Sequence, residues 1–194
     1  QSPFDVAAAV ALLDEAGYAD TDGDGWRETP DGQPIDIVMQ TPSSDALRVR
    51  AGELVAEYAA AVGVRITPQP GDFGVWGATV RERGDYQMAV WGWSAPVQQN
   101  PDRMKGLFHT EGSLNFGQFS DAEMDRLLEA FTTTLDPAKR LELAADIQAR
   151  IASEVPYLTL YYPDVLQGYR PAAYDGWLTV PGTGAFDKLS FLPR

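Results

Sequence analysis

An acidic loop is the first stretch of the chain whose residue types and spacing could do chemistry. Three aspartates alternate with other residues ahead of a glycine, which is the order of the first half of an EF-hand calcium loop. In this register the candidate calcium ligands are Asp20, Asp22, Asp24, the Trp26 carbonyl, Glu28 and Asp31. Calcium binds several hard oxygen ligands on a tight loop, so the pattern predicts a structural calcium site.

The same loop also fits a β-hairpin without metal. The last ligand position is Asp31, in place of the longer glutamate that binds calcium through both oxygens, and Gly32-Gln33-Pro34 follows in place of a second helix. In the hairpin, residues 26–28 would pair with residues 33–35, and aspartate side chains would accept hydrogen bonds from backbone amides. The sequence leaves both interpretations open, and neither makes a cofactor necessary for function.

An apolar run over residues 86–93 is the second candidate region. It is apolar on both alternating faces, which is typical of a central strand covered on both sides in a parallel sheet. Ligands of open α/β sheets bind beyond the carboxyl ends of the strands, so we expect the ligand-binding surface at Trp91-Gly92-Trp93-Ser94. One of the two tryptophans also suits the core, and we expect Trp93 and Ser94 to be the more exposed. The residues that we expect to line a ligand cleft are Trp91, Trp93, Ser94, Gln98, Asn115 and Phe116.

The sequence contains no pattern that demands catalysis. His109 is the single histidine, and no nucleophile-elbow sequence is present to accompany it. The chain has no cysteine, which excludes a thiolate nucleophile or a thiolate metal site. Carboxylate pairs are frequent, but in an acidic chain most belong to a solvated face. We therefore predict a protein that is not an enzyme, with a carboxylate-dependent hydrolase as an alternative.

Charge excludes two classes of partner. The chain has 28 acidic and 15 basic residues and a formal net charge of −13. Nucleic-acid binding needs clustered lysine and arginine, and so does binding to an anionic membrane surface. We expect neither.

The elements that position these residues follow a β-α-β pattern in the first half of the chain. Strands are predicted over residues 35–40, 64–67 and 86–93, and helices over 5–17, 45–62 and 73–83. Successive crossover units of this kind imply a parallel sheet. The second half changes character: a long loop with a short helix near 101–107 is followed by two helices, a strand over 157–162 and an irregular tail. Ser120 with Glu123 is the expected capping box of the first of these helices, and Asp136-Pro137 starts the second.

Several motifs, taken in order, resemble the extracytoplasmic solute-binding proteins of peptide-type ABC importers (solute-binding family 5). The motifs are LDEAGY at 13–18, DGDGWR at 22–27, GDYQMAVWGW at 84–93, LFH at 107–109, FSDAEMDRLL at 119–128, AKR at 138–140 and VPYLTLYY at 155–162. The resemblance covers nearly the whole chain. It implies an α/β lobe of the periplasmic-binding-protein type II kind, with a mostly parallel sheet flanked by helices, a C-terminal helical pair and a return strand.

Members of that family are longer and have two lobes that close on a ligand. The resemblance implies that residues 1–162 are the second lobe and that residues 163–194 are a tail returning toward a first lobe that this chain lacks. It implies capture of a peptide or related polar solute for import, an ABC permease as partner, and a location in the periplasm or on the cell surface. The missing part would carry the export signal. An alternative of another class is a calcium-stabilised extracellular interaction module.

One departure from the family pattern concerns the ligand. Peptide binders of the family often carry an aspartate shortly after the tryptophan, which pairs with the α-amino group of the ligand. Here Pro96 falls at that place. A free peptide N-terminus would lack a charge-assisted bond worth roughly 1.5–3 kcal/mol. A modified peptide, a sugar or another polar solute is then the expected ligand, unless the first lobe supplies the charge.

Overall fold

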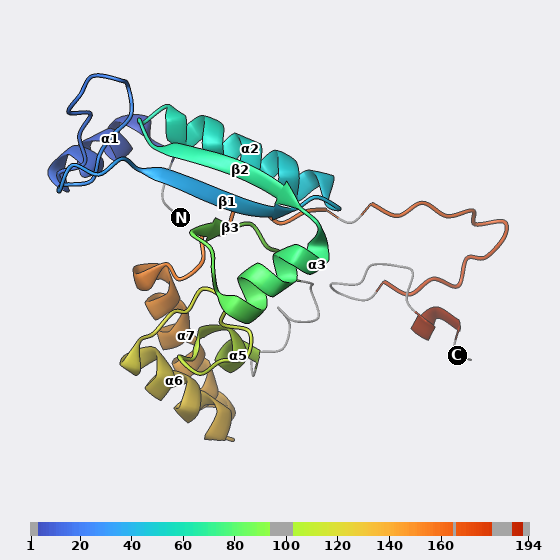
Figure 1. Cartoon of the computed structure of the whole chain (residues 1–194). Helices are drawn as coiled ribbons and strands as arrows, with labels where there is room; N and C mark the ends of the chain where they lie inside the picture. The colour runs from blue at the N-terminus through green and yellow to red at the C-terminus, as the bar shows by residue number, and fades with distance from the viewer. Residues whose placement is uncertain (1–3, 94–102, 165, 180–187, 192–194) are drawn as a thin grey trace. The chain divides into compact units, whose positions relative to one another are not determined.

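The computed structural model describes residues 4–93, 103–164, 166–179 and 188–191 (Figure 1). The chain divides into two compact units, Gln1–Trp91 and Gly92–Arg194, and each is described by itself. The sequence-based division at residues 162 and 163 stays a prediction. None of the helices in the described ranges combines the length and apolar content that crossing a membrane requires.

A three-stranded parallel sheet in the order β2-β1-β3 forms the centre of the first unit. β1 (Asp36–Pro42) pairs with β2 (Arg65–Gly71) along its whole length, whereas β3 (Met88–Ala89) pairs with β1 through two residues only. The parallel α/β arrangement is confirmed. The expectation that residues 86–93 form the central strand is wrong for the described residues, because β1 lies in the middle and β3 at an edge.

β2 is longer than predicted because it contains two prolines without being interrupted by them. The predicted strand stops at residue 67, yet Pro68 and Pro70 continue it and pair with Met39 and Thr41 in the ladder. Proline has no N–H to donate, so it is tolerated where that position faces away from the neighbouring strand. The place of β2 at the edge of the described sheet meets this condition.

Helices precede and connect the strands of the first unit. They are α1 (Val6–Glu15), α2 (Ala46–Ala60), α3 (Phe73–Trp76) and the π-helix η1 (Gly77–Arg83). The predicted helix from residue 5 is confirmed as α1, and Asp5 caps it, since its carboxylate accepts a hydrogen bond from the Ala8 N–H at 2.9 Å. The expected single α-helix over 73–83 is α-helical only as far as Trp76.

α2 packs closely on the strands because it carries a glycine at the point of contact (Figure 1). Gly52 is buried, and a Cβ atom there would lie 3.0 Å from Thr41 Cγ2 and 3.3 Å from Met39 Cε. A side chain at this position would push α2 away from β1.

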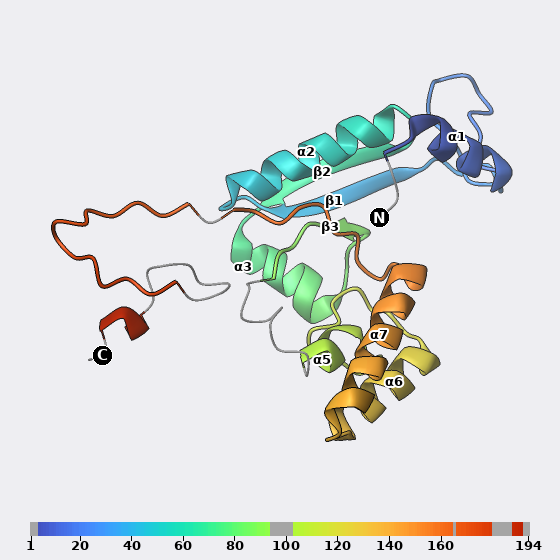
Figure 2. The same cartoon turned by 180° about the vertical axis from the view of Figure 1, so that it is seen from behind.

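The second unit contains a pair of helices, α6 (Ala122–Thr133) and α7 (Pro137–Glu154), that lie side by side (Figure 2). The short helix α5 (Met104–Phe108) packs on α6. Buried apolar side chains one turn apart on the two long helices form one core, which consists of Met124, Leu127, Leu128, Phe131, Leu143 and Ile147. The predicted helical pair is therefore confirmed.

The starts and ends of these helices agree with the sequence except at one residue. Asp136 caps α7 with Pro137 in its first turn, as expected, and α7 ends just before Pro156. The cap of α6 is Asp121 and not Ser120: its Oδ1 accepts the Met124 N–H at 2.7 Å. The carboxylate is charged and also meets an arginine of α7, so it is the stronger acceptor of the two.

The predicted strand over residues 157–162 is wrong, because no strand is assigned there in the described part of the chain. Its β-forming side chains are exposed, Leu158 to 76% and Tyr162 to 75%. Such side chains favour a strand only when a partner strand is present. Further along, Tyr174 and Trp177 meet edge to face, and both also contact Phe191 in the 3₁₀ helix η3 (Lys188–Phe191).

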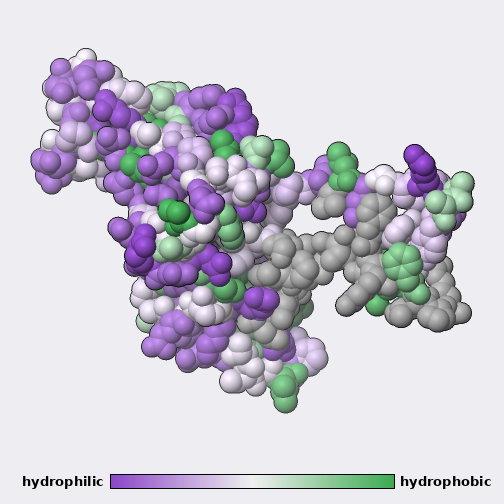
Figure 3. Space-filling view, turned by 45° about the vertical axis from the view of Figure 1, so that its right-hand side comes forward, coloured by the Kyte–Doolittle hydropathy of each residue, from purple (hydrophilic) through white to green (hydrophobic). Residues whose placement is uncertain are grey.

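The face of the molecule drawn in Figure 3 is mainly hydrophilic in its described residues. This agrees with the excess of acidic over basic residues in the sequence. Apolar residues in that view are scattered in small groups.

Candidate functional site

A cluster of three aromatic rings lies at the carboxyl edge of the sheet in the first unit. Trp91 follows β3, and α3 follows the end of β2 directly, so parallel strands bring them to the same edge. The Trp91 ring stacks on Trp76 at a centroid distance of 4.4 Å and an interplanar angle of 13°. Phe73 lies 5.8 Å from Trp91. Trp76 is buried, but Phe73 is 44% exposed, so the cluster offers an apolar ring to solvent.

A positive charge lies next to this cluster. Arg48, in the first turn of α2, places its Cζ 5.0 Å from the centre of the Trp91 ring. A guanidinium at this distance from an aromatic ring is attracted to its π-electrons. Arg48 also pairs with Asp45, the N-cap of α2, at 3.1 Å. The edge can thus offer a flat apolar surface and a hydrogen-bond donor to a polar solute.

The second unit has an aromatic pair of its own. Trp93 stacks on Phe116 with the centroids 5.7 Å apart and an interplanar angle of 24°. The backbone beside Phe116 is held by the Tyr157 hydroxyl, which accepts the Gly117 N–H at 3.3 Å. Burial raises the pKa of the Tyr157 phenol, so it stays neutral. The structure thus brings together two of the six predicted cleft residues.

Asn115 is committed to the loop that contains it. Its Nδ2 donates to the carbonyls of Phe119 (2.7 Å) and His109 (3.1 Å), and its Oδ1 accepts the Phe119 N–H at 3.0 Å. These bonds fix residues 109–119 and use most of the amide's capacity. Asn115 thus helps to hold the loop that carries Phe116, and its contact with a ligand stays a prediction. The other two predicted cleft residues, Ser94 and Gln98, lie outside the described residues, as does Pro96.

The acidic loop gathers four of its five candidate side chains. One carboxylate oxygen from each of Asp20, Asp22, Asp24 and Glu28 lies within 4.8 Å of the others. Such a group has the chemistry to hold a hard cation. Asp31 is not part of this group: its Oδ1 accepts the Thr29 hydroxyl at 2.7 Å, which lowers the pKa of the Asp31 carboxyl.

The loop also shows the features of the metal-free hairpin. Asp20 accepts the N–H groups of Gly23 (2.7 Å) and Gly25 (2.9 Å), and Asp24 accepts that of Trp26 (2.8 Å). Glu28 forms an antiparallel bridge with Pro34, as predicted. The two interpretations are compatible, because capping a backbone amide leaves other carboxylate lone pairs available.

A comparison with protein families decides what kind of protein carries these sites. A family model described as bacterial extracellular solute-binding proteins, family 5 (middle), matches residues 1–115. This chain belongs to the family 5 solute-binding proteins. The resemblance seen in the sequence is therefore confirmed, and the match favours solute binding over the interaction-module and hydrolase alternatives.

Individual relatives in this solute-binding family agree. The chain is 28% identical over 176 residues to the oligopeptide-binding protein AppA of Bacillus subtilis, covering 84% of this chain and 31% of the relative. It is 26% identical over 195 residues to the di/tripeptide-binding protein 1 of Pseudomonas aeruginosa, covering 97% of this chain and 34% of the relative. The chain thus spans about a third of the length of these curated relatives.

A solved structure confirms the fold. The structure of B. subtilis AppA in complex with a nonapeptide matches with a TM-score of 0.76 and 26% identity, over 84% of this chain and 33% of that one. The periplasmic-binding-protein type II class expected for this family 5 chain is therefore confirmed.

Sequence reasoning missed three residues of this solute-binding chain's candidate site: Phe73, Trp76 and Arg48. Phe73 and Trp76 are three residues apart at the start of the helix after β2, and this position at the carboxyl edge is the signal that could have found them. Arg48 gives no such signal, because its contact with Trp91 joins segments that are distant in the sequence.

Proposed function

We propose that this chain is the ligand-binding second lobe of an ABC importer's solute-binding protein, which captures a peptide or related polar solute for import. Membership of family 5 and the aromatic cluster at the carboxyl edge of the sheet support this proposal. The single observation that carries it furthest is the stacked group of Trp91, Trp76 and the half-exposed Phe73, at the edge where ligands of open α/β sheets bind.

The remainder of the protein would supply the first lobe. The chain spans about a third of its relatives, and its tail exposes apolar side chains such as Leu166, which is 92% exposed. Closure of two lobes would trap the solute, and a membrane permease would receive the closed form. The lobe would act outside the cytoplasm and would bind its solute without transforming it.

The chemistry of the lining suggests how a solute is held. The rings of Phe73 and Trp91 give apolar contact area, and Trp93 with Phe116 gives a second aromatic surface. Ser94 and Gln98 would orient polar groups. Pro96 offers no charge to an α-amino group, so the proposal favours a ligand that does not depend on a free amine.

The test uses the longest reading frame that contains this chain, expressed and purified beside the chain alone. Isothermal titration would measure binding of tri- to nonapeptide pools with free or acetylated N-termini, and of linear oligosaccharides. We expect binding to the long protein, with no preference for free N-termini, and weak or no binding to the chain alone.

Variants then locate the site. Trp91→Ala is expected to weaken binding at least about tenfold, because buried aromatic contacts dominate interface energies. Tyr58→Ala removes an exposed aromatic ring of α2 and is the matched control that should leave the affinity unchanged. Unchanged affinity in Trp91→Ala, or no binding of any of these solutes to the long protein, contradicts the proposal.

A further inference from the structure

His109 occupies a position where gaining a proton would change its hydrogen bonds. It follows α5 and is 9% exposed. Its Nδ1 accepts the backbone N–H of Glu111 at 3.0 Å. A ring nitrogen that accepts carries no hydrogen, so this arrangement belongs to the neutral imidazole with its proton on Nε2.

Two carboxylates face the ring from α6. Asp125 Oδ1 lies 3.8 Å from Nδ1, and Glu129 Oε1 lies 3.5 Å from Nε2. These are the acidic groups within 4.0 Å of the imidazole among the described residues. From the other neighbouring segments, α5 contributes Lys105, whose carbonyl accepts the His109 N–H, and the loop contributes the exposed Glu111.

Protonation would exchange one set of partners for the other. With a hydrogen on Nδ1, the ring can no longer accept the Glu111 N–H, and that amide loses its acceptor. Protonation would add a donor on Nδ1 that faces Asp125, while the Nε2–H that the neutral ring already has would stay toward Glu129, and the positive charge would draw the ring toward both carboxylates. Histidine is the side chain that normally changes charge between pH 5 and pH 8.

The turn around Glu111 is packed too tightly to absorb such a change locally. Gly112 donates its N–H to the His109 carbonyl at 2.8 Å, and a Cβ atom on Gly112 would lie 2.4 Å from the Gly106 carbonyl oxygen. Leu114 also donates to Gly106, at 2.8 Å. A shift at Glu111 must therefore move the backbone on either side of it.

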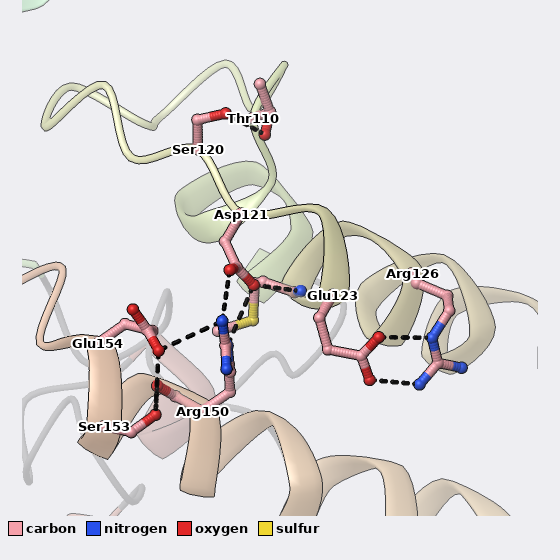
Figure 4. Close-up of polar contacts among 9 residues, drawn as sticks. Thr110, Ser120, Asp121, Glu123, Arg126, Arg150, Ser153 and Glu154 are labelled. Carbon is pink, nitrogen blue, oxygen red and sulfur yellow. Dashed lines mark hydrogen bonds and ion pairs between the residues drawn. The ribbon is translucent and has the colours of Figure 1, made fainter.

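The same loop carries Phe116. Asn115 ties it to the His109 carbonyl through Nδ2, and the Phe116 ring stacks on Trp93. On the α6 side, Asp125 accepts the Thr110 N–H at 2.8 Å, and the hydroxyl of Thr110 bonds to that of Ser120 (Figure 4). Asp125 thus holds one end of the loop while facing the imidazole.

We propose that His109 is a proton-dependent positioning residue for Phe116: the neutral ring holds the turn at Glu111, and the protonated ring releases that turn and draws toward Asp125 and Glu129. The loop would then present Phe116 to Trp93 differently in acid and at neutral pH. A pH-dependent affinity for solute follows from this, and only that consequence rests on the function proposed above.

Nuclear magnetic resonance of the ¹⁵N-labelled chain between pH 5 and pH 8 tests the proposal without a ligand. The Glu111 amide and the Trp93 indole N–H are expected to shift with the same midpoint. The protection factor of the Glu111 amide should fall roughly tenfold on the acid side, as for a lost hydrogen bond. Because no ligand is present, the result does not depend on solute binding, and failure of the proposed function would leave it intact.

Three variants separate His109 from its neighbours. His109→Asn keeps an acceptor near the Nδ1 position but cannot be protonated in this range, so both transitions should disappear. Asp125→Asn removes a charge that favours the imidazolium, so the midpoint should move to lower pH. Glu111→Gln is the matched control: it removes the neighbouring carboxylate and keeps the backbone N–H, so both transitions should remain.

Two outcomes would overturn the proposal. One is a transition at Glu111 that leaves the Trp93 indole unmoved, because the change in the turn would then not reach the aromatic pair. The other is a Trp93 transition that persists in His109→Asn or is abolished in Glu111→Gln. If His109→Asn fails to fold, the direction of the midpoint shift in Asp125→Asn decides, and an unchanged or raised midpoint is the contrary result.

Discussion

The two units bury their apolar side chains in different ways. In the second unit, the helical pair encloses Met124, Leu128 and Ile147 so that none is exposed. In the first unit, the aromatic cluster buries Trp76 but leaves Phe73 44% exposed. The helical core is complete without a further partner, whereas the aromatic cluster has an open side. The comparison predicts that the helical core mainly stabilises the fold, whereas the exposed face of Phe73 is the part of the aromatic cluster that is open to a ligand.

The most direct test of this comparison is to truncate one side chain in the helical core and one in the aromatic cluster. Leu128→Ala should lower the free energy of unfolding by about 2–5 kcal/mol, because it leaves a cavity in a closed core. Phe73→Ala, the matched change at the open cluster, should cost less than about 1 kcal/mol, since much of the ring is already in water. Urea unfolding followed by circular dichroism measures both. Equal costs would mean that the cluster is as much a structural core as the helical pair.

A second test concerns the ion pair that joins the start of α6 to α7. Asp121, the N-cap of α6, accepts hydrogen bonds from two guanidinium nitrogens of Arg150 of α7, at 3.1 and 2.5 Å (Figure 4). The Arg150 hydrogen bond, and then that of the Met124 amide, hold the pKa of the Asp121 carboxyl below its usual range. A carboxyl whose pKa is lower in the folded state stabilises the fold above the unfolded pKa, about 4, and loses that effect as the pH falls further.

Arg150→Gln should therefore lower the melting temperature at neutral pH, and the difference from wild type should shrink as the pH falls below about 4. Arg126→Gln is the matched control, because Arg126 pairs with Glu123 at a more exposed place on α6 (Figure 4). Exposed pairs contribute little, so its effect should be clearly smaller. If Arg150→Gln and Arg126→Gln lower the melting temperature equally, the Asp121–Arg150 pair stabilises the fold no more than the exposed pair on α6 does.

The last test concerns the acidic loop of the first unit. We propose that the group of Asp20, Asp22, Asp24 and Glu28 binds calcium with the weak affinity of extracellular modules, roughly 0.1–1 mM. Calcium at 5 mM should then stabilise the chain by about 1–2 kcal/mol, seen as a rise in melting temperature that chelator reverses.

Two matched variants sharpen the calcium test. Asp22→Asn should remove the response, whereas Asp31→Asn should keep it, because Asp31 bonds to Thr29 and lies outside the group. If the melting temperature does not change on addition of calcium, the proposed calcium site is wrong. The loop would then be a hairpin held by its own hydrogen bonds.

Local signals in the sequence predicted most of the fold. The helix that starts at residue 5 and the helix start at Asp136-Pro137 were predicted, because one element contains each of these signals. The errors came from contacts between residues that are distant in the sequence. Whether residues 157–162 form a strand depends on a partner strand, and the cap of α6 depends on Arg150, which lies 29 residues after Asp121.

The candidate site shows the same division. Trp91 and Trp93 were predicted because they follow a strand, and that position is visible in the sequence. The loop hydrogen bonds of Asn115 were not foreseen, because they exist only once residues 109–119 have folded, and its place in a ligand cleft stays a prediction. Arg48 was missed because it reaches Trp91 from another crossover unit.

The two prolines of β2 also set the direction in which the sheet can grow. An edge strand normally offers a row of free N–H groups to which another chain can add. Pro68 and Pro70 remove two successive donors from the outer side of β2, so a strand arriving there would find acceptors without matching donors. The edge next to β2 is thereby protected against association with other sheets. Any strand contributed by the rest of a longer protein is expected to join beside β3.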